Sequence, residues 1–312
     1  MCHNQFDPKG CLQHLLTLAD LPRNTLTGLL DRAEQFRVNP GNLTPQYDLL
    51  AGKTAVNLFF EPSTRTRMSF ELAARRLGAQ IMTLDMAFSS TTKGESLLDT
   101  LYTLEAMNAD LFVVRHQEPG ALETLAQHAL PHAHIINAGE AHLSHPTQGL
   151  LDVLTIRQHK KDFGKLSVTI VGDIRHSRVA RSAVQALTVL GTQDIRFAGP
   201  AELLPDDLAG EKFTNMDKAL KGADVIMMLR IQKERMQTGL IPDEREYSRR
   251  YGLDITRLKL AKPEVLVMHP GPMNRGVEIT SEVADGPRSV IREQVTNGVA
   301  VRMAVMATLM GK

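Results

Sequence analysis

The chain has 312 residues, 43% of them hydrophobic, and a formal net charge of +1. This length suffices for a large core and predicts two domains, and the balanced charge argues against binding to nucleic acid or a membrane surface. No apolar run approaches the roughly 18 residues that cross a bilayer, and the first residues lack the pattern of a secretory signal. Cys2 and Cys11 suit neither a disulfide framework nor a metal site, so we expect a cytoplasmic location.

The opening residues 1–16 show no periodic pattern, and a tail is one interpretation of them. A helix is predicted next, with apolar residues at helical spacing between Leu26 and Phe36. Short apolar runs then alternate with helical patterns, and the predicted strands are 54–60, 81–84, 109–114, 134–137, 167–171, 194–198, 223–229 and 265–268. Strands that alternate with helices predict an α/β fold with two domains, each a parallel β-sheet flanked by helices.

A predicted helix from about residue 149 lies near the middle of the chain and is expected to bridge the two domains. The expected first domain spans 1–149 and the second spans 150–289. The last helical pattern, rich in Val, Ala and Met, is expected to pack back on the first domain as a closing helix over 290–312.

The sequence Ser63-Thr64-Arg65-Thr66 stands between the first predicted strand and a helical pattern. A helix N-terminus offers N–H donors and the favourable end of its dipole to an anion, and arginines add charge-assisted hydrogen bonds. Capping of the helix by Ser63 or Thr64 is also expected. Because capping alone does not explain cations at the positive end of a helix dipole, the stretch predicts a phosphate site.

Further polar groups share one property, since each follows a predicted strand along the chain. They are Lys93-Gly94-Glu95-Ser96, Arg115-His116-Gln117-Glu118-Pro119, His145-Pro146-Thr147-Gln148, Gly172-Asp173-Ile174-Arg175-His176-Ser177-Arg178, Arg230-Ile231-Gln232 and His269-Pro270-Gly271-Pro272. Open parallel sheets bind ligands beyond the carboxyl ends of their strands. We therefore expect one active site, in a cleft between the two domains and lined by these groups.

Several of these residues have a plain structural alternative. His145 at a helix start can be satisfied by the backbone or can serve acid–base chemistry. Arg178 and Arg230 can be solvated surface charges, whereas from separate strand ends they can each grip one carboxylate of a dicarboxylate ligand. Gly172-Asp173 lacks the G-x-G-x-x-G fingerprint, so a nicotinamide site is rejected. The histidines at 132, 134, 142 and 145 have no recognised ligand spacing, so no metal is expected.

Taken together, these motifs resemble the carbamoyltransferase family, and its aspartate branch in particular. The matching stretches are FFEPSTRTRMSFE, TTKGESLLDTLYTLEAM, HPTQGLLDVLTI, GDIRHSRVARS, LRIQKERM and HPGPMNRG, in the family's order. Ser-Thr-Arg-Thr-Arg and His-Pro-Thr-Gln are shared across carbamoyltransferases, whereas Arg230-x-Gln232 and His269-Pro270-Gly271-Pro272 indicate the aspartate branch. The ornithine branch typically carries His-Cys-Leu-Pro near the latter position, and this chain has no such sequence.

The resemblance implies transfer of a carbamoyl group from carbamoyl phosphate to the α-amine of L-aspartate, a step of de novo pyrimidine biosynthesis, without a cofactor. It implies carbamoyl-phosphate binding by Ser63, Thr64, Arg65, Thr66, Arg115, His145, Gln148, Gly271 and Pro272. It implies catalytic roles for Arg65, Thr66, Arg115, His145 and Lys93, and aspartate binding by Lys93, Arg178, Arg230 and Gln232.

Ser89 and Lys93 resemble residues that the family donates from a neighbouring chain, which implies a homotrimer with shared active sites. A regulatory chain or a dihydroorotase-like enzyme is a conceivable further partner. Two other functions stay open, a carbamoyltransferase with a different acceptor and a non-catalytic phosphate-binding subunit. The loop before His145 has Ala141 where the family commonly has glycine, which removes a conformational option there.

Overall fold

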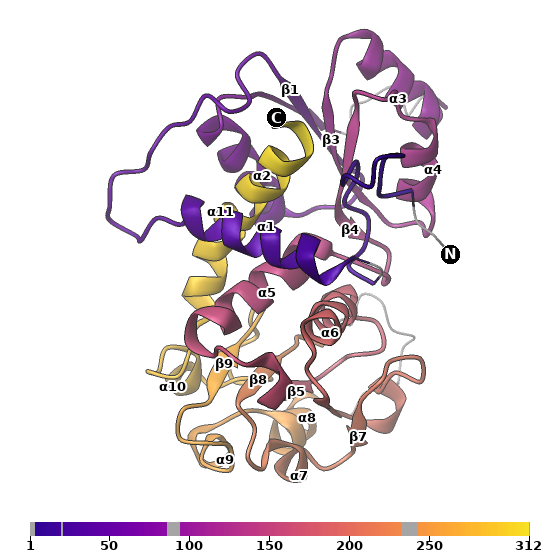
Figure 1. Ribbon diagram of the computed structural model, residues 1–312. Helices are drawn as coiled ribbons and strands as arrows, with labels where there is room; N and C mark the ends of the chain where they lie inside the picture. The colour runs from indigo at the N-terminus through magenta and orange to yellow at the C-terminus, as the bar shows by residue number, and fades with distance from the viewer. Residues whose placement is uncertain (1–3, 20, 86–93, 232–242, 312) are drawn as a thin grey trace. The chain divides into compact units, whose positions relative to one another are not determined.

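The computed structural model describes residues 4–19, 21–85, 94–231 and 243–311 (Figure 1). The chain forms two compact units, of which unit 1 comprises Met1–Leu151 and Thr296–Lys312 and unit 2 comprises Asp152–Val295. The boundaries between the units fall within two helices, α5 (Pro146–His159) and α11 (Ile291–Met310).

Unit 1 is built on a four-stranded parallel sheet in the order β2-β1-β3-β4. Its strands are β1 (Thr54–Phe59), β2 (Gln80–Asp85), β3 (Leu111–His116) and β4 (His134–Glu140). The central strands β1 and β3 are buried along most of their length, which explains why they read as continuous apolar runs. β3 begins later than predicted, because the Asp110 carboxylate accepts hydrogen bonds from Lys53 Nζ (2.7 Å) and the Thr54 N–H (2.9 Å) at the entrance to the sheet.

Helices cover both faces of this sheet: α1 (Arg23–Phe36), α2 (Thr64–Arg76), α3 (Leu97–Ala106) and α4 (Ala121–His128) (Figure 1). Leucines of α3 and α4 pack against the β1 and β3 side chains in one apolar cluster. α2 lies on the other face, where the Arg302 guanidinium of α11 stands 4.9 Å from the centre of the Phe70 ring. The final helix therefore packs against α2 within unit 1.

The N-terminal segment is not a tail, contrary to one interpretation of the sequence. It lies beside β4 as an added parallel bridge, in which the Leu15 N–H donates to Ile135 and the Asn137 N–H donates to Leu15, both at 2.9 Å (Figure 1). The buried Gln5 side chain accepts from the N–H groups of Leu16 (2.7 Å) and Thr17 (3.0 Å). The segment carries no periodic pattern because its order comes from these long-range contacts.

Unit 2 holds a five-stranded parallel sheet in the order β7-β6-β5-β8-β9. Its strands are β5 (Ser167–Val171), β6 (Asp194–Ala198), β7 (Glu211–Phe213), β8 (Val225–Met228) and β9 (Leu266–Met268). The sequence did not predict β7, which is a short edge strand with two exposed charged residues and therefore has no apolar run.

The helices of unit 2 are α6 (Arg178–Leu190), α7 (Met216–Leu220), α8 (Glu244–Tyr251), α9 (Ile255–Leu258) and α10 (Ser281–Ala284), with 3₁₀ turns η3 (Phe163–Lys165) and η4 (Ala201–Leu203). α7 and α8 share one apolar cluster with β8 and β9, in which Tyr247 and Tyr251 are the largest side chains. The predicted architecture of two parallel sheets flanked by helices is confirmed. Within the described part of the chain, no helix is both long and apolar enough to span a bilayer.

Candidate active site

The Ser63–Thr66 motif lies where β1 gives way to α2, as predicted. Ser63 is the N-cap residue, but its side chain forms no capping hydrogen bond within the described chain, so the expectation of a side-chain cap by Ser63 is wrong. The first turn of α2 holds no acidic residue. The first N–H groups of a helix have no intrahelical acceptor and can therefore bind an anion, and Arg65 in this turn is exposed. Thr66, in the same turn, is buried, with only 8% of its surface exposed.

Arg115 lies beside this turn because β3 is the neighbour of β1. It pairs in register with Phe59, and its carbonyl accepts the Phe60 N–H at 2.9 Å. Its guanidinium donates to the Ala138 carbonyl of β4 at 3.2 Å, and its Nε stands 3.4 Å from a Glu61 carboxylate oxygen. Sequence reasoning missed Glu61, which orients Arg115 toward the end of the sheet.

His145 and Gln148 lie at the start of α5, after the loop that leaves β4. His145 is 4% exposed, and its carbonyl accepts the N–H groups of Gln148 (2.9 Å) and Gly149 (3.2 Å), so the residue opens the helix. Its predicted place at a helix start is therefore correct. These hydrogen bonds fix the backbone of His145 at the start of α5, and the low exposure shows that its imidazole is enclosed by the protein.

A buried polar network supports the loop before His145. The Asn137 amide nitrogen donates to the Ser144 hydroxyl (2.6 Å) and the Leu16 carbonyl (2.8 Å), and its oxygen accepts the Gly139 N–H (2.7 Å). The Ser144 hydroxyl in turn donates to Leu16 at 3.0 Å. The network thus fixes Ser144, the residue directly before His145. No local sequence pattern predicts this network, because Leu16 is distant in the chain.

The same loop contains a strained residue and a buried acid. Ala141 has φ +44°, in the left-handed region that favours glycine, so the departure from the family's pattern falls on a position where glycine fits better. Burial raises the pKa of the neighbouring Glu140 carboxyl, against the lowering effect of hydrogen bonds from the Leu122 and Gly120 N–H groups. These two N–H donors hold Glu140 at the start of α4.

In unit 2, Arg178 is the first residue of α6, immediately after Ser177. The Ser177 hydroxyl caps the helix by accepting the Ala180 N–H at 3.1 Å, and Arg178 is 5% exposed. Asp173, fully buried in the loop from β5, accepts from the His176 N–H (3.2 Å) and lies 2.9 Å from His176 Nδ1. The solvated-charge interpretation of Arg178 is therefore wrong, because the residue is buried at the start of α6.

Arg230 follows β8, the strand next to β5, and is half-buried. The two strand ends approach closely, since the Leu229 N–H donates to Val171 at 2.8 Å. Gly172 has φ +128°, and a Cβ added to it would lie 2.6 Å from the Leu229 carbonyl oxygen. Gly172 thus allows the close packing of the segment that carries Arg230.

The turn after β9 is framed by a buried histidine and glutamate. His269 Nδ1 accepts the Gly271 N–H at 2.8 Å, which assigns the ring proton of the neutral form to Nε2, 3.2 Å from Glu278 Oε1. The same Glu278 oxygen accepts the Asn274 N–H at 2.6 Å. These contacts shape the backbone at Gly271 and Pro272, for which the family resemblance implies contact with carbamoyl phosphate.

Within unit 1, the structure brings the Ser63–Thr66 turn, Arg115 and the start of α5 to the carboxyl ends of adjoining strands. Within unit 2, it brings the loop to Arg178, the segment of Arg230 and the turn at Gly271 to adjoining strand ends in the same way. Ser89, Lys93 and Gln232 lie outside the described residues. Among the residues that are described, no three His, Cys, Asp or Glu side chains gather in a group that could hold a metal ion.

Two family models match the chain. Residues 13–158 match the carbamoyl-P binding domain of aspartate/ornithine carbamoyltransferase, and residues 164–309 match its Asp/Orn binding domain. Together the two matches cover nearly the whole chain.

Solved structures of both kinds of enzyme are similar to this chain. Aspartate transcarbamoylase of Trypanosoma cruzi, in complex with carbamoyl phosphate and aspartate, has 28% identity and a TM-score of 0.84, over 96% of this chain and 97% of that one. Ornithine carbamoyltransferase of Pyrococcus furiosus has 31% identity and a TM-score of 0.85, over 96% and 97%. The Thermus thermophilus ornithine enzyme has 27% identity and a TM-score of 0.83, over 96% and 99%. Overall similarity therefore does not distinguish the two acceptors.

Proposed function

The chain belongs to the aspartate/ornithine carbamoyltransferase family, and we propose that the acceptor it carbamoylates is L-aspartate. The products would be N-carbamoyl-L-aspartate, an intermediate of de novo pyrimidine biosynthesis, and phosphate. The observation that carries the choice of acceptor is the pair of arginines at neighbouring strand ends of unit 2, Arg178 and Arg230.

Charge complementarity favours aspartate over ornithine. Aspartate offers two carboxylates, each of which can accept a bidentate pair of hydrogen bonds from one guanidinium. The side chain of ornithine carries an ammonium group, which a second guanidinium would repel. The lack of a His-Cys-Leu-Pro sequence supports the same choice, since Gly271-Pro272 stands at that place.

The phosphate of carbamoyl phosphate would bind at the N-terminus of α2. Ser63, Thr64, Arg65 and Thr66 would supply N–H, hydroxyl and guanidinium donors, at a helix end without a competing acid in its first turn. Arg115, already oriented by Glu61, would bridge the phosphate and the carbonyl oxygen. His145 and Gln148 would contact the carbamoyl group, and the backbone at Gly271 and Pro272 would help to position it.

The chemistry then needs no covalent intermediate with the protein. The neutral amine of aspartate attacks the carbonyl carbon, and the carbonyl π electrons move to oxygen to form a tetrahedral oxyanion. Thr66, Arg115 and His145 would stabilise that oxygen, each donor contributing on the order of 3 kcal/mol. Collapse of the intermediate breaks the bond to the phosphate, which leaves with the proton lost by the amine.

Paired substitutions separate the two substrate subsites. Arg178→Gln or Arg230→Gln should raise the KM for aspartate by about 10- to 100-fold, with little change in the KM for carbamoyl phosphate. Arg65→Gln should raise the KM for carbamoyl phosphate. Arg288→Gln is a matched control in unit 2, where the guanidinium pairs, among the described residues, only with the Glu264 carboxylate (2.7 and 3.1 Å). Unchanged aspartate kinetics in both acceptor-side variants would exclude the proposed subsite.

The active unit is proposed to be a homotrimer, in which Ser89 and Lys93 act in the site of a neighbouring chain and Lys93 and Gln232 contact aspartate. Trimers mixed from Arg65→Ala and Lys93→Ala chains, each inactive alone, should regain partial activity because some sites then receive both intact residues. If verified hybrids show no recovery, the two residues act in the same chain and this part of the proposal fails.

A further inference from the structure

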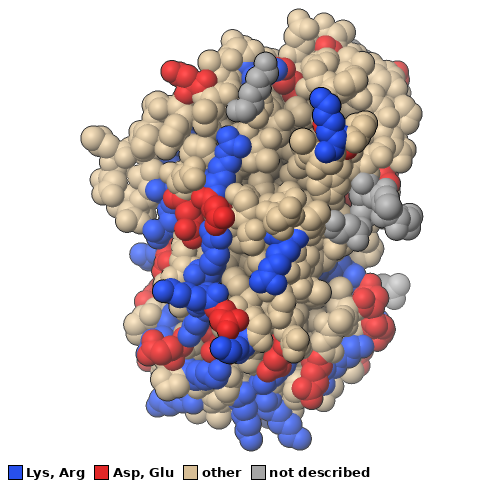
Figure 2. Space-filling model, viewed as in Figure 1, with Lys and Arg blue, Asp and Glu red and all other residues tan. Residues whose placement is uncertain are grey.

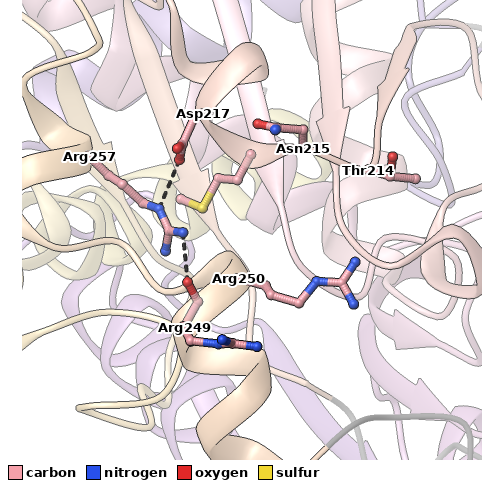
Figure 3. A pocket seen from close by; sticks show the side chains of 7 residues that line it. Thr214, Asn215, Asp217, Arg249, Arg250 and Arg257 are labelled. Atoms are coloured by element: carbon pink, nitrogen blue, oxygen red, sulfur yellow. Dashed lines mark hydrogen bonds and ion pairs between the residues drawn. The ribbon is translucent and has the colours of Figure 1, made fainter.

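A polar pocket lies in unit 2 among residues that the proposed carbamoyl transfer does not use. Its volume is about 390 Å³, and its lining is Thr214, Asn215, Met216, Asp217, Arg249, Arg250 and Arg257 (Figure 3). The residues come from the turn before α7, from the first turn of α7, from the last turn of α8 and from α9. A volume of this size falls in the range of sites for small molecules.

The walls of the pocket are held in place by hydrogen bonds. Arg257 donates from Nε to Asp217 (2.9 Å) and from its two terminal nitrogens to the carbonyls of Gly252 and Arg249, both at 2.7 Å. On the other side, the Tyr251 hydroxyl donates to the Thr214 carbonyl at 2.9 Å. The pocket is therefore formed before any ligand arrives, because α8, α9 and the turn before α7 are tied to one another.

The pocket has an excess of positive charge. Asp217 is the acid in its lining and is already paired with Arg257, which leaves Arg249 and Arg250. The Arg249 side chain forms no hydrogen bond or ion pair with the residues that the structure describes. Arg250 stands over the Tyr251 ring at 5.3 Å and has Glu246 at 3.8 Å, a loose surface pair.

The side chains of Arg249 and Arg250 extend to the same side of α8, with Asn215 and Thr214 across the hollow (Figure 3). Lys and Arg side chains also gather on the visible surface at the end of unit 2 where α7 and α9 lie (Figure 2). Nearby lysines at 218, 221 and 259 are exposed. This field would attract anions toward the pocket.

We propose that this pocket binds a small multivalent anion that carries phosphoryl or carboxylate groups, held by Arg249 and Arg250 against the polar wall of Thr214 and Asn215. A guanidinium pair matches such groups because each can donate two parallel hydrogen bonds. The site would be separate from the carbamoyl-phosphate and aspartate subsites, since it shares no residue with them. The bound anion would contact the last turn of α8, the helix that also supplies the buried Tyr247.

The test measures anion binding by isothermal titration calorimetry to the full chain carrying Arg65→Gln, so that the proposed phosphate site of unit 1 does not contribute. Pyrophosphate and citrate are the two probes. Binding at one site per chain is expected for at least one probe, and Arg249→Gln or Arg250→Gln should weaken it by about 10-fold or more. A preference for pyrophosphate would assign a phosphoryl ligand, and a preference for citrate would assign a polycarboxylate.

Arg245→Gln is the matched control, because it removes the same charge from an exposed position of α8 that does not line the pocket. It should change the affinity by less than about twofold. Absence of binding by both probes would overturn the proposal. Equal weakening by Arg245→Gln and Arg249→Gln would also overturn it, since the anion would then respond only to net charge. Carbamoyl transfer by the unmodified chain is assayed separately, so neither failure bears on the proposed function.

Discussion

At the scale of single residues, the Asn137 amide joins the distant N-terminal segment to the end of β4 and to the loop before α5. It bonds to Leu16 in the N-terminal segment, to Gly139 at the end of β4 and to Ser144 before α5. All its polar atoms are buried, and a buried polar group that loses its partner costs about 1–3 kcal/mol. The network therefore links the stability of unit 1 to the position of His145.

Replacing Ser144 by alanine tests that link. The loss of the hydroxyl leaves Asn137 and Leu16 each without one partner, so we expect unfolding to become easier by about 1–2 kcal/mol. The kcat of carbamoyl transfer should fall several-fold, because the residue before His145 is no longer fixed. Steady-state kinetics and denaturant unfolding measure the two effects.

Thr100→Val provides the control, since it removes a buried hydroxyl of α3 that donates to the carbonyl of the N-cap residue Ser96 at 3.1 Å. It should lower stability without lowering kcat. If Ser144→Ala and Thr100→Val affect kcat equally, the Asn137 network has no role in positioning His145.

Ala141→Gly should stabilise the protein by about 0.5–1 kcal/mol, because glycine adopts φ +44° without the steric penalty that alanine bears. The midpoint of denaturant unfolding measures the gain. Ala201→Gly, at an exposed position of η4 with ordinary φ, should instead lower stability. A loss of stability from both substitutions would show that the loop has no strain at Ala141.

At the scale of elements, the contact between β5 and β8 fixes where the Arg230 segment lies. Gly172→Ala would place a Cβ 2.6 Å from the Leu229 carbonyl oxygen and force one strand end to move. We expect a loss of about 2–4 kcal/mol of stability and a raised KM for aspartate, with the KM for carbamoyl phosphate unchanged. The paired KM values are the measurement.

Gly222→Ala is a matched control, because Gly222 has φ +68° and no atom within 4 Å of an added Cβ. It should cost only about 1 kcal/mol of backbone strain and leave both KM values as they are. An aspartate KM that rises equally in both variants would mean that general destabilisation, not the position of Arg230, is responsible.

The N-terminal segment introduces a pH dependence into the stability of unit 1. Burial lowers the pKa of His14 from 6.5 to about 4, with a smaller contribution from His134. The unfolded chain therefore binds a proton at this residue as pH falls below 6.5, while the folded chain does not until about pH 4. The free energy of unfolding therefore keeps the full contribution of the neutral His14 ring above pH 6.5. It decreases by about 2–3 kcal/mol as the pH falls toward 4.

His14→Asn should flatten that dependence, because an amide oxygen can replace Nδ1 as acceptor of the Ile135 N–H (3.0 Å) without titrating. Unfolding free energies between pH 4 and pH 7 measure the change. A wild-type curve that stays flat over this range would contradict the assignment to His14.

At the scale of the whole molecule, the sequence predicts those parts of the fold that produce a pattern of neighbouring residues. Buried strands such as β1 and β5 are continuous apolar runs, and the ligand groups follow them because parallel sheets collect such groups at their carboxyl ends. The edge strand β7 and the bridge at Leu15 have no such pattern, since one is exposed and the other depends on a partner more than a hundred residues away. The contacts of Asn137 and Gly172 could not be predicted for the same reason.

In the proposed reaction, hydroxyls and guanidinium groups of unit 1 bind the phosphate, and Arg178 and Arg230 of unit 2 bind the carboxylates of aspartate. Overall similarity to aspartate and ornithine enzymes is nearly equal, at 28% and 31% identity. In the proposed function, the choice of acceptor therefore depends on a few side chains, Arg178 and Arg230 above all. Acceptor selectivity is the property of the whole molecule that tests this account.

The most direct measurement is the formation of ureido product from carbamoyl phosphate with aspartate and, separately, with ornithine. We predict turnover with aspartate, with a kcat/KM at least about 100-fold above that for ornithine, because two guanidinium groups select a dicarboxylate. Preferential turnover of ornithine would contradict the assignment of Arg178 and Arg230 to the carboxylates of aspartate. Binding of carbamoyl phosphate without turnover of either acceptor would contradict the proposed reaction itself.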